Sequence, residues 1–138
     1  MNYLATILLL FFSLSVHSTE PEKLSDLGLL QWKNRIILVN NLHNQHAVLA
    51  LFEQNKSEMK ERDIIWFVFS GDEAHTNYQG ALSEDFIAKT RESYQIGPEK
   101  IMLIGKDGGV KFLLDRMDLE AIFTEIDAMP MRQNEMVH

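Results

Sequence analysis

The chain has 138 residues, which is enough for one domain with one hydrophobic core. It contains no cysteine, so disulfide bonds and every reaction that needs a thiol are excluded. Its formal net charge of -7 argues against nucleic acid or an anionic lipid surface as the main partner, because both prefer a basic face.

An apolar segment near the N-terminus predicts a secretory signal peptide. Residues 4–16 are apolar or small, and this run is too short to span a bilayer as a lone helix. Small residues at Val16 and Ser18 place signal-peptidase cleavage after Ser18. We therefore expect a signal peptide over residues 1–18 and a single mature domain over residues 19–138, periplasmic or secreted, with no stable membrane insertion after cleavage. An uncleaved anchor is the alternative, because only the amino terminus is positive before the apolar run.

The first half of the mature chain alternates apolar runs with a helical pattern. Residues 27–31 are expected to form an edge strand or a turn. Residues 35–40 and 63–70 are continuous apolar runs bounded by polar residues, which is typical of buried, parallel strands. Residues 47–61 lie between these two runs and predict a helix, whose apolar face contains Val48, Leu51, Phe52 and Met59.

The second half predicts a helix, a β-hairpin and a final helix. A polar loop over residues 71–80 is followed by a helix that Ser83 caps and that runs to Tyr94. Residues 101–104 and 110–114 are two short strands joined by a tight turn, whose glycines supply the positive φ that such turns require. Asp118 caps the last helix, which ends at Pro130 and whose apolar stripe contains Leu119, Ile122, Phe123, Ile126 and Met129.

Together these elements predict an α/β fold with the order β-α-β-α-β-β-α. Two strands joined by a helix are expected to run parallel, and the hairpin adds an antiparallel pair. The prediction is therefore a four-stranded mixed sheet with flanking helices, and this order of elements is the thioredoxin-like topology.

Four short motifs carry a resemblance to a known family. They are WKNR at 32–35, ERDI at 61–64, LIGKDGGVK at 103–111 and DAMPMR at 127–132. Over roughly residues 24–136 the chain resembles the bacterial domain of unknown function 4174 family of exported domains, which is similar to the thioredoxin-like domain of animal sushi-repeat matrix proteins. The resemblance implies a thioredoxin-like fold and export. The family usually shows a second arginine after Arg132, and this chain has Gln133 there.

The residues just before the first predicted strand combine an aromatic ring with two charges. Trp32 is expected to pack over the start of the strand, while Lys33 and Arg35 keep their charges in water. The alternative is that all three form an exposed contact patch.

Thioredoxin-like enzymes carry their reactive cysteine just after the first strand, where this chain reads NNLHNQH over residues 40–46. No thiol is present there, so disulfide exchange and thiol peroxidase chemistry are ruled out. The side-chain amides of Asn41 and Asn44 are expected to cap the helix that follows.

Polar residues after the first two strands form the candidate ligand site. They are His43, His46, Asp72, Glu73 and His75. The loops that follow two parallel neighbouring strands leave the same edge of a sheet, where α/β folds bind ligands. Imidazole and carboxylate groups suit a divalent transition metal, with His43, His46, Asp72 and His75 as candidate ligands. The positive N-terminus of the helix opposes a cation and favours a small anion, and polar capping without any ligand is the third hypothesis.

The residues indicate no catalytic group and no cofactor. The favoured hypothesis is a non-catalytic binding or assembly module for an unknown envelope or extracellular protein. The alternatives are a metal-assisted enzyme with its site at the His43 and His75 loops, and a structural domain without a small ligand. Three convergent ligands would favour the enzyme, whereas a broad apolar patch would favour a partner-binding role.

Overall fold

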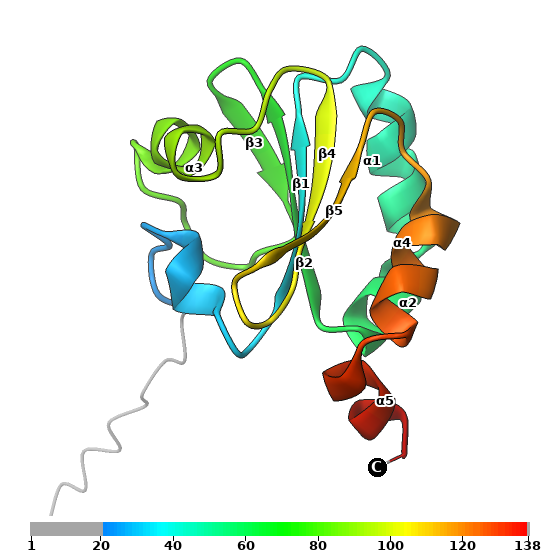
Figure 1. Cartoon of the computed structure of the whole chain (residues 1–138). Coiled ribbons are helices and arrows are strands. Elements are labelled where there is room, and N and C mark those ends of the chain that lie inside the picture. The colour runs from blue at the N-terminus through cyan, green and yellow to red at the C-terminus, as the bar shows by residue number, and fades with distance from the viewer. Residues whose placement is uncertain (1–20, 138) are drawn as a thin grey trace, which may run out of the picture.

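A mixed β-sheet with helices on both faces forms the frame of the computed structural model, which describes residues 21–137 (Figure 1). The strands are β1 (Arg35–Asn40), β2 (Ile64–Ser70), β3 (Glu73–Thr76), β4 (Lys100–Ile104) and β5 (Val110–Leu114). The helices are the 3-10 helix η1 (Leu27–Leu30), α1 (Gln45–Gln54), α2 (Lys56–Glu61), α3 (Phe86–Tyr94), α4 (Leu119–Asp127) and α5 (Pro130–Val137). The signal peptide predicted over residues 1–18 lies outside the described residues. Within residues 21–137, no helix has the length and apolar character needed to cross a membrane.

The predicted α/β class and the predicted strand directions are confirmed. The strands lie in the order β3-β2-β1-β4-β5. β1 runs parallel to β2, with Arg35 opposite Ile64 and Asn40 opposite Phe69. β4 pairs antiparallel with β1 and with β5. The crossover between β1 and β2 contains α1 and α2, as a parallel connection requires.

The sheet has five strands, so the prediction of four is wrong. The additional strand, β3, lies in the segment predicted as a polar loop and pairs antiparallel with β2 from Ser70 opposite Glu73 to Phe67 opposite Thr76. Gly71, with a φ of 57°, makes the reversal between the two strands. Glu73 and His75 are exposed while Ala74 and Thr76 are half-buried, so this short edge strand lacks the apolar run that marked the others.

Four details of the helices also differ from the prediction. Residues 27–30 form a 3-10 helix, and the helix predicted over residues 47–61 is divided at Asn55 into α1 and α2. Ser83 does not cap α3 directly, because its hydroxyl donates to Asp85 (2.9 Å), which is the residue before the helix. Pro130 does not end the helical structure but begins α5, where a proline has no amide hydrogen bond to lose.

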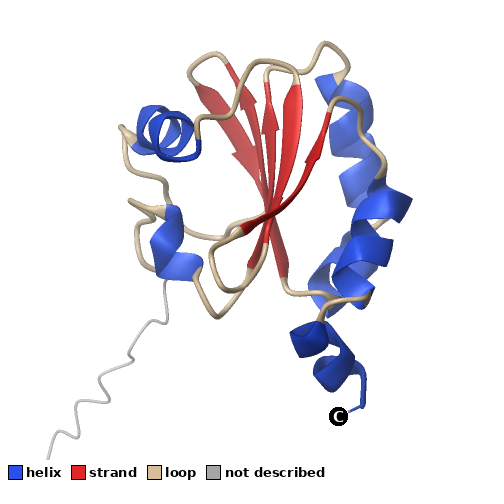
Figure 2. Cartoon of the chain, in the orientation of Figure 1, coloured by secondary structure: helices blue, strands red, loops and turns tan. Residues whose placement is uncertain are grey.

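The core divides between the two faces of the sheet (Figure 2). Helices α1, α2 and α4 cover one face, where Ile37, Val39 and Val68 are buried. On the other face η1 and α3 cover Leu38 and Phe67. Neighbouring residues of one strand contribute to opposite clusters, as strand geometry requires.

The last predicted helix is confirmed as α4, with its capping residue. The Asp118 carboxylate accepts a hydrogen bond from the Ala121 amide at 3.0 Å. Ile122 and Ile126 are fully buried against the sheet. Phe123, predicted in the middle of the apolar stripe, is only half-buried, and the Arg62 guanidinium lies 4.3 Å from the centre of its ring.

Candidate binding site

The ligand site predicted at the ends of β1 and β2 is not assembled. His43 and His46 are exposed, and His43 contacts Glu99 rather than a residue of the β2–β3 turn. His75 pairs opposite Val68, part-way along the sheet edge, while Asp72 remains in the exposed turn. Within residues 21–137, no group of three or more histidine, aspartate or glutamate side chains is placed to hold a metal ion.

Side-chain amides occupy this end of the sheet instead. Asn40 is buried, and its amide donates to the carbonyls of Ile96 (3.2 Å) and Gly97 (3.0 Å) while its oxygen accepts from Arg91 (3.0 Å). Asn41 accepts a hydrogen bond from the Gly71 amide at 3.0 Å. These hydrogen bonds join β1 to the β2–β3 turn and to the segment before β4. The polar side chains at this end of the sheet therefore bond to one another and to the backbone.

The predicted capping role of the two asparagines is wrong. Asn41 bonds to the β2–β3 turn, and the side chain of Asn44, the residue before α1, makes no capping hydrogen bond. The physical reason is local: Asn41 has a φ of 53°, so the chain turns sharply before α1 begins. A small anion at the start of α1 stays a prediction.

A groove of about 640 Å³ lies between α2 and β2 and is a candidate site for a small ligand. Such a volume lies within the range of about 300–1,000 Å³ that is usual for small-ligand sites. Its lining combines aromatic, amide and charged side chains: Asn34, Phe52, Glu53, Lys56, Met59, Lys60, Asp63, Ile64, Ile65, Trp66, Thr76, Asn77 and Gln79.

Two aromatic rings form the apolar part of the groove. Trp66 lies on the same face of β2 as Ile64 and Val68, because alternate residues of a strand share a face. Its ring packs against the ring of Phe52 from α1, with the centroids 5.1 Å apart and the planes tilted by 46°. Trp66 is half-buried, so part of its ring is available to a ligand.

A side chain closes the edge of β2 beside the groove. β3 ends at Thr76, and the first residues of β2 therefore have no strand partner on that side. Asn77 takes the place of a strand there, because its oxygen accepts from the Trp66 amide (2.8 Å) and its amide donates to the Ile64 carbonyl (3.0 Å). This pair of hydrogen bonds fixes the groove wall and blocks pairing with a foreign strand.

Among residues 21–137, Lys60 is the cation of the groove that has no ion-pair partner. Lys56 lies 4.0 Å from Glu53, and Asp63 accepts from Lys106 at 2.9 Å. Lys60 is exposed and takes part in no ion pair within the described part of the chain. The groove can therefore offer an ammonium group to an anionic ligand.

An ionic cluster around three buried arginines joins the groove at Asp63. We use this name for Arg35, Glu58, Glu61, Arg62, Asp63, Lys106, Asp127, Arg132 and Glu135. Glu135 accepts two hydrogen bonds from the guanidinium of Arg35 (3.1 and 3.3 Å) and a third from Lys106. Asp127 accepts two from Arg62 (3.0 and 2.9 Å) and one from Arg132 (3.1 Å).

The pKa values of the Asp127 and Glu135 carboxylates are both lowered by their neighbours in the cluster. Hydrogen bonds from Arg62 and then from Arg132 hold the pKa of Asp127 below its ordinary value, against the opposing effect of burial. Burial alone would raise the pKa of Glu135, but hydrogen bonds from Lys106 and Arg35 outweigh it and the pKa is lowered. The pKa of Lys106 is raised, because its bonds to Asp63 and Glu135 outweigh the effect of burial.

This cluster fastens the C-terminal helix to the sheet. Arg132 is the only buried residue of α5, and it also donates to the Glu61 carbonyl (3.1 Å) beside the start of β2. Arg35 is 1% exposed, so the expectation that its charge stays in water is wrong. Trp32 is 63% exposed and does not pack over the strand as expected, because its backbone, with a φ of 68°, turns toward the Lys106 carbonyl.

Comparison with known proteins identifies one family. A family model described as "Domain of unknown function (DUF4174)" matches residues 26–135. No curated protein and no solved structure matches the chain. The four sequence motifs lie within the matched residues, and they supply Arg35, Arg62, Lys106, Asp127 and Arg132 to the ionic cluster.

Proposed function

This chain belongs to the DUF4174 family, and from that premise we propose that it is an exported, non-catalytic binding module whose ligand site is the groove between α2 and β2. The observation that carries the proposal is a groove of about 640 Å³ that combines the half-buried Trp66 ring with Lys60, which has no ion-pair partner in the part of the chain that the structure describes. The absence of cysteine removes thiol chemistry, so binding is the role that these groups serve best.

The thioredoxin-like relationship is part of this proposal. Its support is the order β2-β1-β4-β5, in which a parallel pair joins an antiparallel hairpin, together with helices on both faces of the sheet. β3 lies outside this group of four strands and adds an edge beside β2.

The ligand that fits the groove has a flat or apolar body and one anionic group. The rings of Trp66 and Phe52 offer a surface on which a flat body can stack. Lys60 can pair with the anion, and the hydroxyl of Thr76 and the amide of Gln79 can contact polar substituents at the margin.

A fluorescence titration tests the groove with a defined probe. In the Trp32→Phe background Trp66 is the only tryptophan, because the chain has two. We expect anilinonaphthalene sulfonate, which combines aromatic rings with one sulfonate, to quench the Trp66 emission. Lys60→Gln should raise the dissociation constant about tenfold, which corresponds to the loss of one charge-assisted hydrogen bond of about 1.4 kcal/mol.

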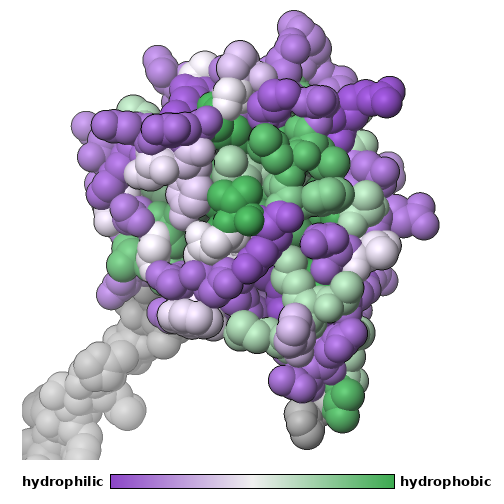
Figure 3. Space-filling model, viewed as in Figure 1, coloured by the Kyte–Doolittle hydropathy of each residue, from purple (hydrophilic) through white to green (hydrophobic). Residues whose placement is uncertain are grey.

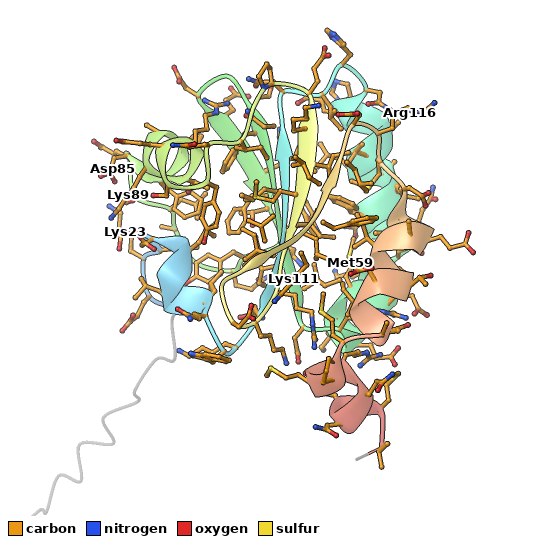
Figure 4. All side chains as sticks on the ribbon, in the orientation of Figure 1. Lys23, Met59, Asp85, Lys89, Lys111 and Arg116 are labelled. Carbon is orange, nitrogen blue, oxygen red and sulfur yellow. The ribbon has the colours of Figure 1, made fainter. Side chains whose placement is uncertain are left out.

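The matched control is Lys23→Gln. Lys23 is also exposed, and it lies on the opposite side of the sheet from Met59 of the groove (Figure 4). Its substitution should leave the dissociation constant unchanged. If both substitutions changed the dissociation constant equally, in proteins whose urea unfolding curves match, the groove would not be the binding site.

Export is tested on the secreted protein. Cleavage after Ser18 should give a mature protein that begins at Thr19. Edman sequencing or intact mass of the protein recovered from periplasm or medium measures this directly. Recovery of a chain that begins at Met1 would contradict the proposed export.

A further inference from the structure

The two edges of the sheet differ in a way that points to an interface. The β3 edge is short and polar, and Asn77 closes the part of β2 that β3 leaves open. β5 is the opposite edge, and within the described residues no strand pairs with its outer side. An open edge strand is a template for pairing with another chain unless charges, prolines or a covering element protect it.

Apolar side chains surround this open edge. Val110 and Leu113 are 51% and 56% exposed and lie beside Ile104 and Met102 of β4. Phe112 and Leu114 point to the other face, where they are half-buried. Figure 3 shows the apolar surface that gathers over β5 on the face toward the viewer. Along β5, backbone N–H and C=O groups without a strand partner among the described residues therefore occur together with exposed apolar side chains.

The sequence of this edge is complementary to itself in the antiparallel direction. It reads Lys-Phe-Leu-Leu-Asp over residues 111–115. If two copies pair with Leu113 on the two-fold axis, Lys111 lies opposite Asp115 of the second copy, and Phe112 lies opposite Leu114 of the second copy. Each such pair occurs twice by symmetry, so the register matches opposite charges with each other and apolar side chains with each other.

From this complementarity we propose that β5 pairs antiparallel with β5 of a second copy of this chain and forms a symmetric dimer with one continuous sheet. Asp115 directly follows the last residue of β5; its carboxylate is highly exposed and pairs with Lys100 of its own chain. Lys111 lies near the start of β5, and Arg116 lies beyond its end (Figure 4). In the dimer, Lys111 keeps its partner Asp107 (2.7 Å) and Asp115 keeps Lys100, and each gains the other residue of the second copy as a further partner. The interface is separate from the groove, which lies at the other edge of the sheet beside β2 and β3.

Sedimentation equilibrium of the mature protein tests the dimer. We expect a mass that rises with concentration to twice that of the monomer. Leu113→Lys places two like charges at the two-fold axis and should raise the dimer dissociation constant at least about tenfold. Leu29→Lys is the matched control, because Leu29 is a similarly exposed leucine (46%) on η1 and should not affect the dimer.

A charge swap distinguishes this register from any other interface. Lys111→Asp alone and Asp115→Lys alone should each weaken the dimer, because each sets like charges opposite one another. A mixture of the two variants should form a heterodimer, since both cross-strand pairs then carry opposite charges. A wild-type protein that stays monomeric, a dimer that Leu113→Lys leaves intact, or a mixture that fails to associate would each overturn the proposal.

Discussion

Glu135→Gln is expected to lower the free energy of unfolding by about 3 kcal/mol, which is the low end of the usual cost of breaking a buried ion pair. The Arg35 guanidinium is almost fully buried, and the substitution leaves it without its charged partner. Glu135 itself is 26% exposed, so water offsets part of the loss. Urea unfolding of the mature protein measures the effect.

Glu125→Gln is the matched control for this prediction. Glu125 is exposed on α4 and takes part in no ion pair among residues 21–137, so its substitution should change the free energy of unfolding by less than about 0.5 kcal/mol. If Glu135→Gln cost no more than this control, the ionic cluster would not be what holds α5 in place.

The same cluster predicts how stability depends on pH. The pKa values of Asp127 and Glu135 are lower in the folded state than in the unfolded chain, so their contribution is complete above the unfolded values of about 4. It is lost as the pH falls through the lower, folded values. The free energy of unfolding should therefore stay level above about pH 5 and fall below about pH 4, with a shallower fall for Glu135→Gln.

The second large effect is expected in the core beneath α4. Ile122→Ala should lower the free energy of unfolding by about 2–5 kcal/mol, because Ile122 is fully buried against the sheet. Phe123→Ala should cost only about 1–2 kcal/mol, since its ring is half-buried and its packing against the core and its contact with Arg62 are both partial. Equal losses in parallel denaturation curves would contradict the orientation of α4.

The elements with strong apolar periodicity could be predicted from the sequence. β1 and β2 are unbroken apolar runs, and the stretch between them is long enough for a helical crossover, which fixes their parallel direction. β3 could not be predicted, because its residues alternate between exposed and half-buried and include no run of apolar side chains. α5 was missed because a proline that prevents α4 from continuing can also begin the next helix.

The ionic cluster could not be predicted for a different reason. Arg35 and Glu135 are 100 residues apart in the chain, and neither carries a local signal that it has a partner. Arginine is rarely buried, so the sequence favours a solvated side chain at the start of β1. Only the three-dimensional arrangement shows that β1, β4 and α5 bring Arg35, Lys106 and Glu135 together.

The groove also depends on tertiary structure. Trp66 and Phe52 belong to apolar patterns that identify them as core residues, and the sequence does not indicate that Trp66 remains half-exposed beside Lys60. Of the candidate histidines, His43 follows the end of β1 as the sequence predicts, whereas His75 lies within β3. They remain apart because β3 carries His75 away from the end of β2 while His43 contacts Glu99.

Backbone amide chemical-shift mapping tests the proposed binding site most directly. The mature ¹⁵N-labelled protein is titrated with anilinonaphthalene sulfonate, and the shift of each amide is followed. If the ligand binds in the groove, the amides of Lys60, Trp66 and Asn77 should shift most. In Lys60→Gln the same amides should no longer shift at the same ligand concentration. Largest shifts at residues 43–46 and 72–75, or along β5, would contradict the assignment of the groove as the ligand site.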